Sequence, residues 1–94
     1  MCSQKLIMSK TTIIDVRTPQ EFDGGHVAGS INIPLNEITD REAEIAILPK
    51  PIILCCLSGH RSGQAAQYLN QKGVACENGG GWLEVNERYK MKST

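Results

Sequence analysis

The chain has 94 residues, of which 40% are hydrophobic and 21% are charged, and its ten basic side chains balance its ten acidic ones. A chain of this length has room for one modest hydrophobic core, so we expect a single domain. The zero net charge provides no overall field that would gather nucleic acid or an anionic membrane surface. No apolar run approaches the ~20 residues that a membrane-spanning helix needs, so we expect a soluble protein.

We expect this domain to occupy residues 1–94, with its core at about 12–83 and tails at 1–10 and 88–94. The first ten residues lack a continuous apolar segment followed by small residues, so they do not indicate a secretory signal. The cytoplasm is therefore the expected compartment, and the periplasm is the alternative for a chain whose signal peptide has been removed.

The four cysteines, Cys2, Cys55, Cys56 and Cys76, form no C-x-x-C motif and have no paired histidine spacing. This pattern argues against a structural zinc site, so we expect no metal. Cys55 and Cys56 are adjacent and could pair only through a strained bridge. We therefore expect reduced thiols.

The first part of the chain predicts a strand, a short helix and a second strand. Thr12–Val16 is a β-branched apolar run that is typical of a buried strand. Thr18–Glu21 combines a capping box with proline at the first helical position, which predicts a helix from Thr18 to the Gly24-Gly25 pair. Ile31–Pro34 alternates and then meets proline, which favours a short strand at or near a sheet edge.

The middle of the chain predicts helical structure followed by a buried strand. Leu35–Leu48 has apolar side chains in rough helical spacing, with an expected break near Thr39-Asp40. Two prolines then precede Ile52–Cys55, a continuous apolar run of the kind found in a central parallel strand.

The last predicted elements are a helix and a strand. Ser62–Lys72 has a helical pattern that Gly73 should close in the left-handed conformation, and Val74–Cys76 reads as the next strand. The alternation of strands and helices predicts an α/β sandwich with helices on both faces of a mainly parallel sheet. Such sheets bind ligands beyond the carboxyl ends of their strands, which directs attention to the segment after Cys55.

The segment Ile52–Ser62 has the features that activate a cysteine. It places Cys56 after a buried strand, then a short Ser/Gly loop, then a helix start with His60 and Arg61. Unpaired amides of a first helical turn, the helix dipole and nearby cations all favour the thiolate. The same amides would hold an anionic persulfide or the oxyanion of a donor.

Four ordered segments resemble the signature segments of a rhodanese domain of the small single-domain (thiosulfate sulfurtransferase) type. They are IDVRTPQEF at 14–22, GHVAGSINIP at 25–34, CLSGHRS at 56–62 and NGGGW at 78–82. The similarity extends over roughly residues 12–83. It implies a three-layer α/β/α sandwich with a mainly parallel, five-stranded sheet, an active loop from Cys56 to Arg61, and transfer of a sulfane sulfur.

The resemblance implies that Cys56 is the catalytic nucleophile, which takes sulfur from thiosulfate or a similar donor and passes it as a persulfide to cyanide or a thiol. The implied substrate-binding residues are Leu57, Ser58, Gly59, His60, Arg61 and Ser62. Leu57 and Ser58 stand where thiosulfate-preferring relatives have basic residues, which leaves the donor open. No organic cofactor or metal is needed. We expect a monomer whose partners are small molecules or a protein thiol, without nucleic acid or membrane.

Several residues outside the loop are expected to have structural roles. Asp15 and Arg17 should form an internal ion pair, and His26 should be a hydrogen-bonded structural histidine. Cys55 and Cys76 are expected in the core. Gly79–Gly81 should serve a turn with positive φ or a close approach to the active loop.

Two other functions compete with sulfur transfer. Counted from Cys55, the spacing to Arg61 is C-x5-R, which a Cys-dependent phosphatase requires, although Gly59 three residues after Cys56 favours the rhodanese loop. A rhodanese-like domain can also be a binding module without catalysis, which the uninterrupted loop argues against.

Overall fold

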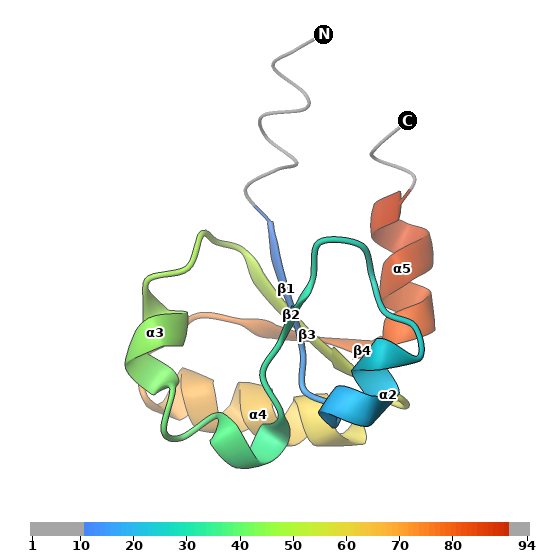
Figure 1. The fold of residues 1–94 in the computed structure, drawn as a ribbon. Coiled ribbons are helices and arrows are strands. Elements are labelled where there is room, and N and C mark those ends of the chain that lie inside the picture. Colours follow the sequence, from blue (N-terminus) through green and yellow to red (C-terminus); the bar gives the residue numbers. More distant parts are fainter. Residues whose placement is uncertain (1–10, 91–94) are drawn as a thin grey trace, which may run out of the picture.

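The chain alternates strands and helices along its length, as Figure 1 shows. The structure is a computed structural model, and it describes residues 11–90. Its elements are β1 (Thr12–Asp15), α2 (Pro19–Asp23), β2 (Ile31–Asn32), the 3-10 helix η1 (Leu35–Glu37), α3 (Glu42–Ala46), β3 (Ile52–Cys56), α4 (His60–Gln71), β4 (Glu77–Gly81) and α5 (Trp82–Lys90). The predicted break between the two helical pieces that follow β2 is confirmed.

The strands form one parallel sheet in the order β2-β1-β3-β4. The predicted edge strand, β2, is confirmed at one side, and β3 lies between β1 and β4 with every residue buried. The resemblance implied five strands, and residues 11–90, which the structure describes, contain four. The carboxyl ends of β1 and β3 lie together, because Asp15 pairs with Cys55 in the register.

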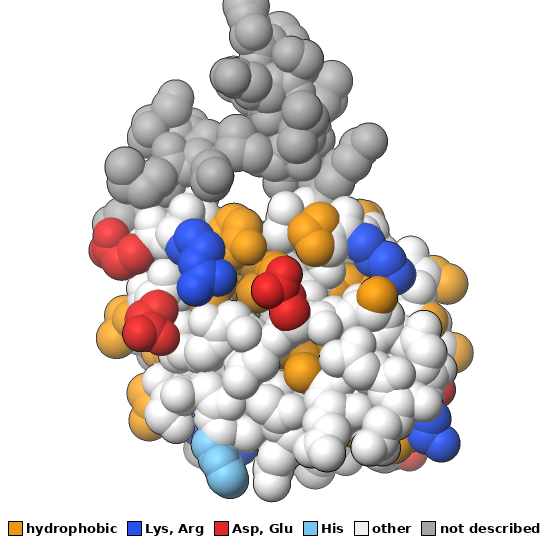
Figure 2. Space-filling view, turned by 180° about the vertical axis from the view of Figure 1, so that it is seen from behind, with side chains coloured by type: hydrophobic (Ala, Val, Ile, Leu, Met, Phe, Trp, Pro, Cys, Tyr) orange, Lys and Arg blue, Asp and Glu red, His pale blue; other side chains and the backbone are white. Residues whose placement is uncertain are grey.

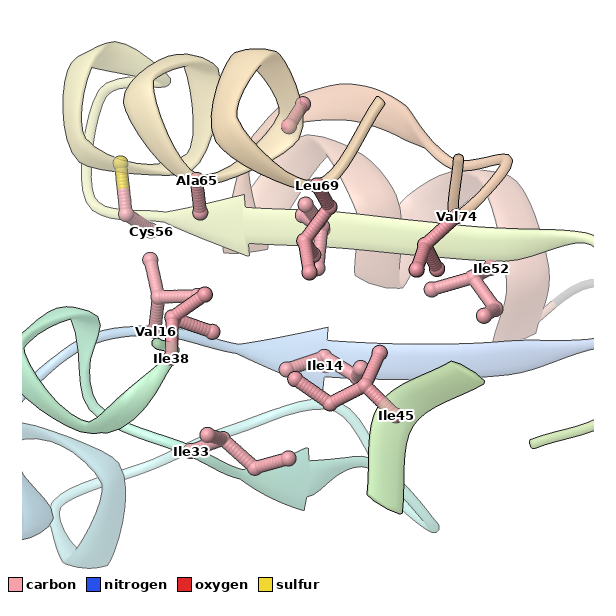
Figure 3. Packing of buried hydrophobic residues seen from close by; sticks show 12 residues of the cluster. Ile14, Val16, Ile33, Ile38, Ile45, Ile52, Cys56, Ala65, Leu69 and Val74 are labelled. Carbon is pink, nitrogen blue, oxygen red and sulfur yellow. The ribbon is translucent and has the colours of Figure 1, made fainter. Parts of the chain in front are cut away.

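Apolar residues cover both faces of the sheet, which confirms the three-layer arrangement. The larger cluster lies between the sheet and α4, η1 and α3, and Figure 3 shows ten of its residues by name. Its fully or nearly fully buried members are Ile14, Val16, Ile33, Ile38, Ile45, Ile52, Leu54, Cys56, Ala65, Ala66, Leu69 and Val74. The smaller cluster joins Ile53 and Cys55 of β3 to Val85 of α5 and to Val27.

The turn after β1 is held by the capping box and the ion pair that the sequence predicts. Thr18 caps α2, since the Glu21 amide donates to Thr18 Oγ1 at 3.2 Å and the Thr18 amide donates to Glu21 Oε1 at 3.0 Å. The buried Arg17 guanidinium donates to both carboxylate oxygens of Asp15 and to the Gly25 carbonyl. His26 bonds the Phe22 carbonyl through Nδ1 and stacks on the Phe22 ring, a local structural role as expected.

The predicted strand at Val74–Cys76 is wrong. Val74 is buried in the core, but the backbone of Cys76 bonds a side chain: its amide donates to Asn70 Oδ1 and its carbonyl accepts from Asn70 Nδ2, both at 3.2 Å. Because these backbone groups are already paired, the hydrogen-bonded pairing of β4 with β3 begins only at Glu77 and includes Gly80 and Gly81. Cys76 is half-buried, and Gly73 closes α4 with φ of 87°, as predicted.

The helix α5 follows β4 directly and was not predicted from the sequence. Val85 on α5 is fully buried, and Trp82 and Tyr89 pack beside it against the second face of the sheet. Arg88, which the sequence analysis assigned to a solvated tail, lies in this helix.

Charged groups are interspersed on the surface. Figure 2 shows one face with scattered basic, acidic and apolar side chains and no broad area of a single charge. Within residues 11–90, no helix has the length and apolarity that crossing a membrane would require.

Candidate active site

Cys56 is the last residue of β3 and lies at the carboxyl end of the sheet, where the sequence placed it. The residue is fully buried, at 0% exposure, and its sulfur points toward the start of α4 (Figure 3). Below the sulfur lie apolar residues of the larger cluster. The thiol is therefore enclosed, and the groups that reach the sulfur decide its charge state.

Hydrogen-bond donors of the loop converge on the Cys56 sulfur. The Gly59 amide donates to Sγ at 3.0 Å, and Ser62 Oγ lies 3.5 Å from it. Burial raises the pKa of the Cys56 thiol. Hydrogen bonds from the Ser62 hydroxyl and amide and from the Gly59 and Ser58 amides lower the pKa, and their combined effect is larger than that of burial. The net result is a Cys56 pKa below the ordinary value for cysteine.

The loop can close around the sulfur because Gly59 precedes α4 in the left-handed conformation, with φ of 101°. A Cβ on Gly59 would lie 3.1 Å from Gly80 Cα, so the backbone of the loop contacts the backbone of β4 too closely for a side chain at this position. Gly80 itself has φ of 94°. Of the two roles expected for Gly79–Gly81, the close approach to the loop is confirmed, whereas the segment lies in strand β4 instead of a turn.

Arg61 is bound by a carboxylate from α2. Its guanidinium donates to both oxygens of Glu21, at 2.9 and 3.2 Å, and both side chains are about one-third exposed. This pair lowers the pKa of Glu21 to about 2. Sequence analysis identified Glu21 only as part of the capping box, and nothing local in the sequence indicated that its side chain also reaches the loop 40 residues away.

The other predicted loop residues differ in exposure. Leu57 is 60% exposed, Ser58 and His60 are exposed, and Ser62 is fully buried beneath the loop. The structure thus brings together the sulfur, the Ser58 and Gly59 amides, the amide and hydroxyl of Ser62, and the Arg61–Glu21 pair, while Leu57, Ser58 and His60 are exposed.

Cys55 faces the other side of the sheet and packs with Val27, Ile53 and Val85. Burial and the Asp15 carboxylate raise the pKa of the Cys55 thiol to about 12. A phosphate-binding loop built on Cys55 would need that sulfur on the same side as Arg61. The observed placement therefore argues against the C-x5-R reading.

Asn78 of β4 is a further residue of the site that sequence analysis did not single out. Its Oδ1 accepts from Ser62 Oγ at 2.6 Å and from the Gly80 amide at 3.0 Å, and its Nδ2 donates to the Gly59 carbonyl at 3.0 Å. Its position beside three glycines was the only signal in the sequence, and that signal indicated backbone shape rather than side-chain contacts.

Comparison with known proteins gives consistent similarities. The family model of the rhodanese-like domain matches residues 3–87. "Uncharacterized protein YqhL" of Bacillus subtilis is 48% identical over 64 residues, which are 68% of this chain and 50% of that protein. "Thiosulfate sulfurtransferase PspE" of Escherichia coli is 40% identical over 75 residues, 77% of this chain and 71% of that protein. The chain thus spans about half the length of the first relative.

Solved structures share the fold. A structure described as "rhodanese with anions from E. coli" superposes with a TM-score of 0.71 at 37% sequence identity. The superposition covers 79% of this chain and 89% of that one.

Proposed function

The chain belongs to the rhodanese-like domain family, and from this premise we propose that it is a sulfurtransferase whose Cys56 carries the transferred sulfur. The observation that supports the proposal best is the Gly59 amide, which donates to the buried Cys56 sulfur at 3.0 Å, with the Ser62 hydroxyl also within reach at 3.5 Å. Donors in these positions stabilise a thiolate, and after transfer they can stabilise a persulfide anion.

The reaction consists of two displacements. The Cys56 thiolate attacks the outer sulfur of thiosulfate or a similar donor, the S–S bond of the donor breaks with its electron pair, and sulfite leaves. An acceptor nucleophile, cyanide or a thiolate, then attacks the terminal sulfur of the persulfide and restores the Cys56 thiolate. No general base is needed once the thiolate exists, and no residue beyond the loop has to exchange a proton.

Access to the sulfur has to come through the loop. Because Cys56 is fully buried, a donor reaches its sulfur only after part of the surrounding loop moves. The enclosure has a chemical advantage, since it keeps water and unrelated thiols away from the persulfide between the two displacements.

Intact mass spectrometry tests the proposal. Wild type incubated with thiosulfate should gain the mass of one sulfur atom, and cyanide should remove it. Cys56→Ala should gain nothing, while Cys55→Ala, the matched control one residue away, should behave as wild type. If no donor adds sulfur to the wild type, including an organic thiosulfonate, the enzyme proposal fails and a binding module takes its place.

A further inference from the structure

Asn78 connects three parts of the site through one side-chain amide. It bonds Ser62 of α4, the Gly59 carbonyl of the loop, and the Gly80 amide of its own strand. A Cβ on Gly63 would lie only 3.2 Å from Asn78 Nδ2, so the helix leaves space for the amide. The amide therefore bridges α4, the loop and β4 at the protein surface.

The backbone partners determine which way the amide points. The Gly59 carbonyl can only accept, so Nδ2 must face it, and the Gly80 amide can only donate, so Oδ1 must face that side. Oδ1 is consequently the atom that lies 2.6 Å from Ser62 Oγ. Two oxygens at this separation require a proton between them, and only Ser62 can supply it.

The Ser62 hydroxyl has one proton but two acceptors. Its distance to Asn78 Oδ1 is 2.6 Å and its distance to Cys56 Sγ is 3.5 Å. With the proton on the Asn78 side, Ser62 presents a lone pair to the sulfur, and a lone pair stabilises an S–H group instead of a thiolate. Ser62 can donate to Cys56 only after it releases Asn78.

We propose that Asn78 is a positioning residue that controls the direction of the Ser62 hydroxyl. While Cys56 is a thiol, the hydroxyl donates its hydrogen bond to Asn78. When the thiol ionises, the hydroxyl donates to the sulfur instead. In the first state the Cys56 S–H can donate to Ser62 Oγ. In the second state the Cys56 proton has left for solvent and the Ser62 hydroxyl has rotated to the sulfur. Asn78 Oδ1 keeps its bond from Gly80, and its exposed side chain lets water replace Ser62.

Charged and titratable groups also lie on the elements around the loop. They are Cys55 on β3, His60 and Arg61 on α4, Glu21 on α2, Asp15 and Arg17 at the end of β1, and Glu84 on α5. Cys55, with a pKa of about 12, and Glu21, with a pKa of about 2, do not titrate near neutral pH. A His60→Gln background removes the imidazole from the measurement.

The test is a titration of the Cys56 thiolate by its ultraviolet absorbance, taken as the difference between each variant and the same variant carrying Cys56→Ala. Absorbance needs neither access for a reagent nor a sulfur donor, so the result is independent of whether persulfide formation succeeds. Ser62→Ala should raise the midpoint by about one pH unit, because the thiolate loses a donor. Asn78→Ala should lower it by about half a unit, because Ser62 then donates to sulfur alone.

The opposite signs distinguish the proposal from a purely structural role for Asn78. If Asn78 only held Gly59 in place, Asn78→Ala would raise the midpoint or leave it unchanged, and either result overturns the proposal. In the Ser62→Ala background, Asn78→Ala should have no lowering effect. The matched control is Asn70→Ala. This variant removes a side-chain amide that bonds the backbone of Cys76, away from the loop, and it should not shift the midpoint.

A second variant keeps the proposal testable if Asn78→Ala does not fold. Asn78→Asp retains the size of the side chain and the acceptor for Ser62 and Gly80. The carboxylate holds the Ser62 proton more strongly and adds a negative charge, so the midpoint should rise by about one pH unit or more. A midpoint that falls or stays the same in this variant would contradict the proposal.

Discussion

Cys55 and Cys56 are neighbours on one strand and equally buried, yet their environments differ in nearly every other respect. Successive side chains of a strand point to opposite faces, so Cys55 enters the cluster under α5 and Cys56 enters the site at the start of α4. The pKa of Cys55 is raised to about 12, while the pKa of Cys56 is lowered. Burial alone therefore does not determine the reactivity of a cysteine here; the hydrogen-bond donors that reach the sulfur do.

Each cysteine also has an arginine–carboxylate pair nearby. The Asp15–Arg17 pair near Cys55 is almost completely buried, and Arg17 in addition lies over the Trp82 ring. The Glu21–Arg61 pair near Cys56 is about one-third exposed. We expect the first pair to matter for stability and the second mainly for the local arrangement of the loop.

The largest expected effect is the difference in alkylation between the two thiols. In the native protein at pH 8, Cys56 should react with iodoacetamide at least about 100-fold faster than Cys55, because the Cys55 pKa leaves almost no thiolate at that pH. Peptide mapping by mass spectrometry measures both sites in one sample. Equal rates, or faster labelling of Cys55, would show that the contrast between the two sulfurs is wrong.

Breaking the buried pair near Cys55 should cost stability. Asp15→Asn leaves the Arg17 guanidinium buried without its counter-charge, so the free energy of unfolding should fall by about 3 kcal/mol. Urea denaturation measures the change. Glu44→Gln, which removes a carboxylate from the exposed Arg41 pair, is the control and should change stability far less. Similar losses in both variants would contradict the distinction.

The close approach that shapes the Cys56 loop can be tested with two glycines of similar conformation. Gly59 and Gly73 have φ of 101° and 87°, so alanine at either site should cost about 1 kcal/mol from backbone strain. Only at Gly59 would the new Cβ press on β4, 3.1 Å from Gly80 Cα, whereas at Gly73 it meets nothing within 4 Å.

Gly59→Ala should therefore lose roughly twice as much stability as Gly73→Ala and should raise the Cys56 pKa, because the displaced amide no longer donates to sulfur. Thermal unfolding and the thiolate titration measure the two effects. A Cys56 pKa unchanged in Gly59→Ala would mean that this amide does not control it.

The smallest effect should come from the exposed pair. The pKa of Glu21 falls from an ordinary value of about 4.3 to about 2 on folding, so its ionised form favours the folded state. This stabilisation is fully present above pH ~4.3 and is lost as the pH falls toward 2. Because the pair is about one-third exposed, it should be worth less than about 1 kcal/mol.

The measurement is the difference in unfolding free energy between wild type and Glu21→Gln from pH 6 to pH 2. Glutamine can still accept from the Thr18 amide, so the helix cap is retained. The difference should shrink toward zero at the acidic end. A difference that is constant with pH would indicate that the charge of Glu21 contributes nothing to the pair.

Much of the fold follows from local patterns in the sequence. The apolar runs at β1 and β3, the capping box at Thr18 and the helix stop at Gly73 were all predicted, because each depends on residues within one or two turns of one another. The position of Cys56 between a buried strand and a helix start was equally local. Its role as the nucleophile stays a proposal.

The errors arise where distant groups compete for the same backbone or surface. Val74–Cys76 reads as a strand by composition, but Asn70 takes the hydrogen bonds of Cys76 that a ladder would use. The core was expected to end at about residue 83, but Val85 is buried, because it packs against Ile53 and Cys55 on the second apolar face of the sheet.

The sequence thus determines the strands and helices from β1 to α4 and where the two cysteines fall along the chain, since these depend on short-range spacing. The donors to the Cys56 sulfur come from the loop and the start of α4, but only the tertiary structure brings Glu21, Asn78 and Gly80 to that loop, because these residues lie on elements far away in sequence. Charge on a buried thiol depends on such contacts at atomic distance, and residue order does not specify these distances.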